Sequence, residues 1–104
     1  MNSVNVNIKE SSWLAWLAAR KLKVKSVAIT IGQTVYLHNV SAETFKNDVK
    51  WLTHELEHVK QFRRYGFFNF IFRYLWESIR KGYYNNKFEI EARNSSEFIV
   101  QSSE

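Results

Sequence analysis

The sequence predicts an α+β fold in which a small β-hairpin or sheet packs on a bundle of about four helices. Three observations lead to this class: residues 26–38 alternate β-branched and polar residues around Gly32, apolar residues recur at helical spacing from Phe45 toward Tyr65, and two further helical segments follow. The chain has 104 residues, of which 45% are hydrophobic and 16% aromatic, enough for one small core. We therefore expect residues 1–104 to form a single domain with the long helix at its centre.

The amino-terminal residues predict a short first helix. Residues 1–10 lack a basic region followed by an apolar core, so we expect no secretory signal and a cytoplasmic location. Residues 13–19 are apolar but much shorter than the ~20 residues that a membrane span needs. They are typical of a docked helix, for which Ser11 or Ser12 is the expected N-cap.

The hairpin across residues 26–38 is better defined than its register. A two-residue turn pairs Ile31 with Thr34, whereas a three-residue turn pairs Ile31 with Val35, and both remain open. The free edge of such a hairpin can bind an extended peptide by strand addition. We expect His38, at the end of the hairpin, to lie at the surface rather than to bind a metal.

Capping residues divide the rest of the chain into helices. Ser41 is the expected N-cap of the long central helix, which should end at Gly66. A second helix should run from Phe67 to a stop at Gly82, followed by a loop over residues 83–86 and a last helix from Lys87 with Asn86 as its cap. In so small a domain the many aromatic residues of the second helix are expected mainly in the core, although with the nearby Arg and Lys they also fit a membrane-surface helix.

Composition limits the kinds of site that the chain can build. There is no cysteine, which excludes disulfides and thiolate metal sites and leaves histidine and carboxylate as the strong ligands. The net charge is +5, but the basic residues are scattered as short pairs such as Arg63-Arg64, so we interpret them mainly as solvated surface. A nucleic-acid partner is therefore not indicated.

The central helix carries the sequence His-Glu-x-x-His at His54, Glu55 and His58. Residues four apart share one face of a helix, so both imidazoles can reach one tetrahedral zinc ion while Glu55 approaches the fourth, water-occupied position. Glu89 and Glu91 on the last helix are candidates for the third ligand, and spacing does not separate them, because they flank its apolar face at similar angles. Glu89 has a structural alternative as well, since it occupies the N3 position of a capping box. The simpler alternative is that all these groups are polar residues on helix surfaces.

Residues 54–61 read His-Glu-Leu-Glu-His-Val-Lys-Gln, and residues 88–92 read Phe-Glu-Ile-Glu-Ala. Together these motifs resemble the paired signatures of the small gluzincin-type zinc metallopeptidase domains. The resemblance covers about residues 27–93 and implies a gluzincin-like fold. It also implies a zinc ion with three ligands, His54, His58 and Glu89, and keeps Glu91 as the alternative to Glu89.

Such a site predicts metal-assisted peptide hydrolysis. Zinc would lower the pKa of its bound water toward ~7, and Glu55 would take the proton of that water and deliver it to the leaving amine. Tyr83 or Tyr84, just ahead of the third ligand, is the candidate donor to the oxyanion. The expected substrate is a peptide or protein, and a protein partner that completes the cleft is also compatible with the sequence.

The sequence also departs from the peptidase pattern. Glu57 and Lys60 are charged where peptidases usually carry uncharged or apolar residues, and Lys87 replaces a common proline. Arg93 stands where several gluzincin families carry an Asp that orients a zinc-bound histidine. These differences leave open two other functions: a catalytically inactive zinc-binding interaction module, and a basic aromatic module that binds nucleic acid or membrane surfaces.

Overall fold

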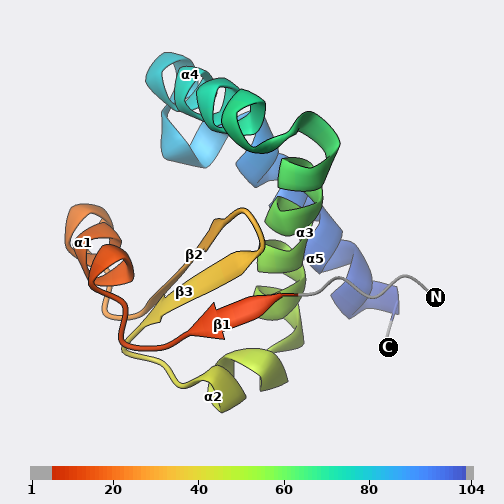
Figure 1. Ribbon diagram of the computed structural model, residues 1–104. Coiled ribbons are helices and arrows are strands. Elements are labelled where there is room, and N and C mark those ends of the chain that lie inside the picture. The colour runs from red at the N-terminus through yellow and green to blue at the C-terminus, as the bar shows by residue number, and fades with distance from the viewer. Residues whose placement is uncertain (1–5, 103–104) are drawn as a thin grey trace.

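The computed structural model describes residues 6–102 and forms, over that range, a three-stranded sheet and five helices (Figure 1). The elements in chain order are β1 (Asn7–Lys9), α1 (Trp13–Leu22), β2 (Val27–Ile31), β3 (Thr34–His38), α2 (Ala42–Asn47), α3 (Val49–Tyr65), α4 (Phe67–Asn85) and α5 (Lys87–Ser102). The predicted α+β class, with a small sheet packed on helices, is confirmed.

The sheet has the strand order β1-β3-β2, with β1 parallel and β2 antiparallel to β3. Ile31 pairs with Thr34, so the hairpin uses the two-residue turn. Gly32 begins that turn with a φ of 65°, which favours glycine. Strand β1 was not predicted, and within the described residues it leaves β2 as an edge of the sheet.

Side-chain caps set the helix starts. Ser12 accepts a hydrogen bond from the Ala15 amide at 3.3 Å, and Ser41 begins α2 in the same way. The prediction of one long helix after Ser41 is wrong, because Asp48 leaves the helical region and caps a new helix by accepting a hydrogen bond from the Trp51 amide at 3.0 Å. The His-Glu-x-x-His sequence, called the metal-ligand motif below, therefore lies on α3, which begins after this break.

Glycine sets the two sharpest changes of chain direction. Gly66 separates α3 from α4 with φ 85° and ψ 155°, and Gly82 kinks α4 with φ 80° and ψ 167°; essentially only glycine adopts this region. The predicted stop at Gly82 is therefore present as a kink, but the predicted loop after it is wrong over residues 83–85, which return to helix. Asn86 caps α5 as predicted, because its Oδ1 accepts from the Phe88 amide at 2.8 Å.

Two small cores lie on either side of the metal-ligand motif. One packs the sheet against α2 and α3 and is centred on Val35, Leu37 and Phe45. The other packs α3 against α4 and α5 and is centred on Phe62, Phe70 and Phe88. Because α3 contacts β2, α2, α4 and α5, it is the central helix, as predicted (Figure 1).

Helix α4 departs from the expectation that its aromatic residues mainly fill the core. Phe70 is 3% exposed, but other large apolar residues of α4 are more than half exposed. These are Phe68, Phe72, Leu75, Trp76 and Ile79. Despite this apolar surface, no helix in the described part of the chain combines the length and apolar character needed to cross a bilayer.

Candidate metal centre

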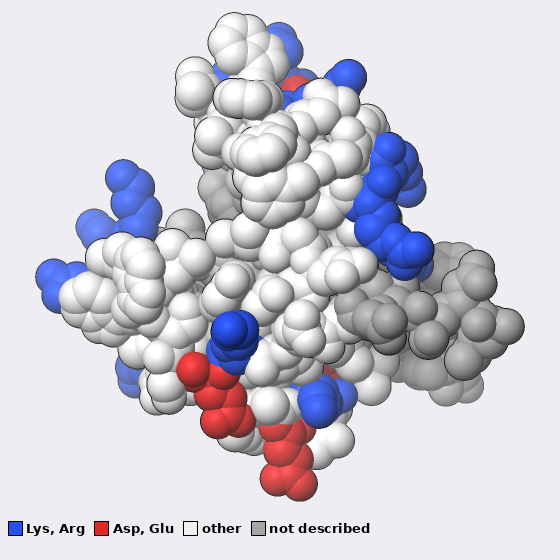
Figure 2. Space-filling model, viewed as in Figure 1, with Lys and Arg blue, Asp and Glu red and all other residues white. Residues whose placement is uncertain are grey.

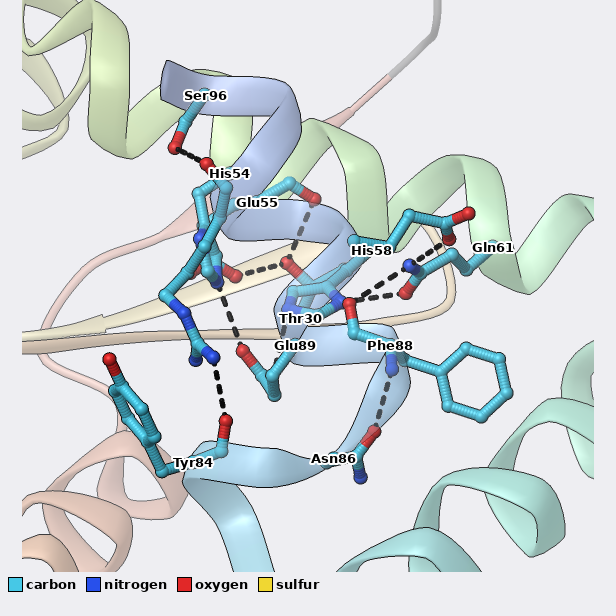
Figure 3. Close-up of polar contacts among 12 residues, drawn as sticks. Thr30, His54, Glu55, His58, Gln61, Tyr84, Asn86, Phe88, Glu89 and Ser96 are labelled. Atoms are coloured by element: carbon cyan, nitrogen blue, oxygen red, sulfur yellow. Dashed lines mark hydrogen bonds and ion pairs between the residues drawn. The ribbon is translucent and has the colours of Figure 1, made fainter. Parts of the chain in front are cut away.

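Three side chains from two helices converge at the centre of the molecule (Figure 3). His54 and His58 project from adjacent turns of α3, and Glu89 reaches them from the first turn of α5. The distance from His54 Nε2 to Glu89 Oε1 is 3.0 Å, and that from His58 Nε2 to Glu89 Oε2 is 3.2 Å. One ligand atom from each residue lies within 4.8 Å of the other two.

This group fits the requirements of a zinc or similar divalent ion. Ligand bonds of about 2.1 Å in a tetrahedral site separate the ligand atoms by roughly 3.4 Å, and the three ligand atoms here lie within 4.8 Å of one another. The set combines two imidazoles with a carboxylate, and both His58 and Glu89 are less than 10% exposed. His54, His58 and Glu89 can therefore hold a metal ion.

Charge is concentrated in this cluster. Burial lowers the pKa of His58, but the hydrogen bond and negative charge of Glu89 raise it to about 9. Burial raises the pKa of Glu89, whereas hydrogen bonds from His54 and His58 outweigh it and hold that pKa far below its ordinary value. Glu89 is thus an anion at neutral pH, which is the form that binds a cation.

A second layer of polar side chains holds the cluster in place. The His58 Nδ1 atom lies 2.8 Å from Gln61 Oε1, and the Gln61 amide donates to Glu91 Oε1 at 2.7 Å and to the Phe88 carbonyl at 3.1 Å. Gln61 is fully buried, so these partners fix its orientation. Glu91, the alternative third ligand, therefore contacts Gln61 rather than the histidines.

Tyr74 on α4 supports Glu89 from the opposite side. Its hydroxyl donates to Glu89 Oε2 at 2.5 Å, and burial together with the charge of Glu89 raises the pKa of Tyr74 well above its ordinary value. The phenol thus stays protonated and remains a donor. The carboxylate of Glu89 is consequently not used for a capping box on its own helix, the competing role that the sequence left open.

Glu55 lies beside the cluster but has its own partner. Its carboxylate is 5% exposed and accepts a hydrogen bond from the Thr30 hydroxyl of β2 at 2.7 Å (Figure 3). Burial raises the pKa of Glu55, partly offset by His58 and by the Thr30 hydrogen bond. The strand next to α3 therefore holds this carboxylate beside the cluster.

A cavity of about 580 Å³ opens beside these groups, between α1, β2 and α4. Its polar end is formed by Glu55, His58 and Glu89. Its remaining wall is largely apolar and includes Leu22, Ile29, Ile31, Phe70, Ile71 and Leu75. The volume lies within the range of small-molecule and side-chain binding sites in proteins.

The two tyrosines predicted as oxyanion donors occupy different environments. Tyr83 lines the cavity together with Glu55 and Glu89. Tyr84 is 70% exposed, lies outside the lining of that cavity, and carries the Arg93 guanidinium 4.0 Å from the centre of its ring. Of the pair, only Tyr83 is placed near the cluster.

Sequence reasoning missed three residues of this site. Thr30 and Tyr74 lie in other elements and carry no motif, so only the fold brings them to Glu55 and Glu89. Gln61 was part of the resemblance but had no assigned role. Its position three residues after His58, on the same side of a helix, was the signal that could have identified it.

Comparison with known proteins gives one family. The model of the eCIS core domain family matches residues 15–66, which is half of the chain. The matched segment runs from α1 to the end of α3 and so includes His54, Glu55 and His58, but it ends before Glu89. No curated protein and no solved structure matches the chain. On the family match, this protein belongs to the eCIS core domain family.

Proposed function

We propose that this protein is a zinc-dependent peptide hydrolase of the gluzincin type, built as one minimal domain. The observation that carries the proposal is the convergence of His54, His58 and Glu89, with Glu55 beside them. Three of these four residues, Glu55, His58 and Glu89, line one cavity. The resemblance of residues 54–61 and 88–92 to paired gluzincin signatures points to the same residues.

Each residue has a role that its surroundings support. His54, His58 and Glu89 would hold the ion, and zinc bound there supplies a Lewis acid that lowers the pKa of a water molecule to about 7. Glu55 would take a proton from the attacking water and pass it to the leaving amine. Its raised pKa suits this task, because a base that is too acidic removes protons poorly at neutral pH.

The surroundings of the cluster favour an extended peptide as substrate. Residues 27–31 of β2 all line the cavity, and β2 is an edge of the described sheet. A peptide paired with that edge would run past Glu55 and His58, with main-chain hydrogen bonds supplying affinity. The apolar wall of the cavity would then accept a large apolar side chain of the substrate.

Metal content measured by elemental analysis tests the ligand assignment. We expect one zinc per chain in the wild type and in His38→Ala, a matched histidine change on β3, and strongly reduced zinc in His58→Ala and Glu89→Ala. Full zinc occupancy in both of these variants would refute the site.

Hydrolysis of a mixed peptide library tests the catalytic step. Glu55→Gln should retain zinc and lose cleavage, because the amide cannot accept the proton. If the wild type binds zinc but cleaves no peptide, the catalytic part of the proposal fails and the inactive zinc-binding interaction module is the better interpretation.

A further inference from the structure

Helix α4 turns an apolar stripe outward. Its members are spaced by three or four residues and lie on one side of the helix. The stripe consists of Phe68 (72% exposed), Phe72 (69%), Leu75 (52%), Trp76 (60%) and Ile79 (78%). The opposite side of α4 already packs in the core through Phe70, so folding of this domain does not use the stripe.

Helix α1, on the other side of the cavity, has a similar exposed face. Trp13 is 72% exposed, Trp16 42% and Leu17 46%. Leu22 at the end of α1 and Leu75 on α4 both line the cavity and are both at least 40% exposed, so exposed apolar side chains flank the cavity on both helices. Exposed apolar surface on this scale marks an interaction site.

The same two helices, with the residues just after α1, have an excess of positive over negative charge. Residues 13–25 and 67–85 contain seven Lys and Arg and a single acidic residue, Glu77, which is 6% exposed. The rest of the chain contains eight basic and nine acidic residues, so the net charge of +5 arises in these two segments. In Figure 2, basic side chains lie over α1 and α4 and also beside the corner between α3 and α4, whereas the acidic side chains in view lie mainly toward α2, where basic side chains accompany them.

This combination distinguishes a lipid surface from a protein partner. The core of a protein interface is depleted in charged residues and especially in lysine. A helix that lies in a membrane interface has Trp, Phe and Leu on one face and Lys and Arg beside them, and anionic headgroups attract those cations. On α4, Arg73 and Arg80 lie along one border of the apolar stripe.

We propose that the exposed faces of α1 and α4 dock this domain onto an anionic membrane surface. We name these faces, together with Arg20, Lys21, Lys23, Lys25, Arg73 and Arg80, the α1–α4 surface. Docking inserts the aromatic side chains at the headgroup boundary and places the basic residues against anionic lipid. It also turns the mouth of the cavity toward the bilayer.

Binding to lipid vesicles provides the test. The probes are vesicles of phosphatidylcholine alone and of phosphatidylcholine with phosphatidylglycerol, separated from free protein by flotation. We expect binding to the anionic vesicles, at least tenfold weaker binding to the neutral ones, and loss of binding as NaCl rises from about 0.1 M to about 0.5 M. A blue shift of tryptophan emission should accompany binding, because three of the four tryptophans lie on the α1–α4 surface.

Two pairs of variants separate the surface from general charge and hydrophobicity. Arg73→Glu with Arg80→Glu should weaken binding at least tenfold, whereas Lys9→Glu with Lys46→Glu, an equal change of charge on β1 and α2, should not. Phe72→Ser with Trp76→Ser should abolish the emission shift, whereas Val49→Ser, at a 55% exposed position on α3, should preserve it. Circular dichroism shows whether each variant remains folded.

Three results would overturn the proposal. The first is no binding to anionic vesicles by the folded wild type. The second is equal binding to neutral and anionic vesicles, which would show that the basic residues do not contribute to membrane binding. The third is a stable dimer in sedimentation that Phe72→Ser with Trp76→Ser converts to monomer, because the stripe would then be covered by a second copy.

Discussion

Gln61 should control how tightly the cluster binds zinc, although it is not a ligand. It is fully buried and its Oε1 lies 2.8 Å from His58 Nδ1, so it fixes which ring nitrogen of His58 faces Glu89. Replacing such an outer partner typically lowers metal affinity 10–100-fold, which is about 1.4–2.8 kcal/mol. We expect Gln61→Met to show a loss of this size.

The choice of methionine separates the hydrogen bond from packing. Methionine has nearly the volume of glutamine but has neither its acceptor for His58 nor its amide donor for Glu91. Gln61→Ala removes the same hydrogen bonds and also leaves a cavity, so it should lose more stability than Gln61→Met but a similar factor in zinc affinity. Zinc affinity is measured by competition with a chelator, and stability by thermal unfolding.

A swapped pair makes the test stricter. Gln61→Glu combined with Glu91→Gln restores an acceptor for His58 and a donor-acceptor pair between positions 61 and 91, so it should recover most of the lost affinity. The reasoning is refuted if folded Gln61→Met binds zinc as tightly as the wild type, within about twofold. Packing around His58 would then be sufficient to orient it.

Three further predictions concern neighbouring groups. Thr30→Val removes the hydrogen bond that lowers the pKa of Glu55. The acidic limb of the pH–rate profile of hydrolysis should therefore move to higher pH while the zinc content stays unchanged, and a limb that does not move would contradict this. In metal-free protein, the His58–Glu89 pair should stabilise the fold fully only between pH 4.5 and 6.5. The contribution of His58 to stability is lost as the pH rises toward about 9, and that of Glu89 is lost as the pH falls below 4.5. Thermal unfolding measured across this pH range should show the maximum. Asn86→Ala removes three hydrogen bonds of 2.8–3.0 Å made by a fully buried side chain, so urea unfolding should show a loss of about 2–3 kcal/mol in the free energy of unfolding. A loss below about 0.5 kcal/mol would argue against the cap.

Local signals predicted the helix caps and the hairpin, because a cap or a turn depends on a few adjacent residues. Strand β1 had such a signal as well, since Val4, Val6 and Ile8 alternate with asparagine, although no strand was predicted there. The break before α3 was marked by Asp48, a good N-cap inside an otherwise helical pattern. Both misses were therefore readable in principle.

The orientation of α4 was not readable in the same way. Periodicity tells which residues share a face of a helix, but α4 has apolar residues on two faces, Phe70 on one and Phe72 on the other. Which face turns inward depends on how α4 packs on α3 and α5 after the change of direction at Gly66. Size and composition favoured a core role for both faces, and that expectation was wrong for the outer one.

The metal-ligand motif shows the same limit. Four-residue spacing on one helix brings His54 and His58 together in any packing of α3. Glu89 and Glu91 are two residues apart on α5 and point to different sides, so the rotation of α5 against α3 decides which one meets the histidines. Long-range packing, not local pattern, settles that rotation.

Arg93 stands at a position where several gluzincin families carry an acidic residue, and in this structure it contacts Tyr84. Its guanidinium donates to the Tyr84 carbonyl at 2.7 Å and covers the Tyr84 ring, so it ties the first turns of α5 to the segment after the Gly82 kink. That segment determines where α5 begins and therefore where Glu89 points. His58 is oriented by Gln61, which lies on the same helix and itself donates a hydrogen bond to Glu91. Gln61 on α3 therefore supports the cluster without an acidic residue at position 93, and an arginine at that position is compatible with metal binding.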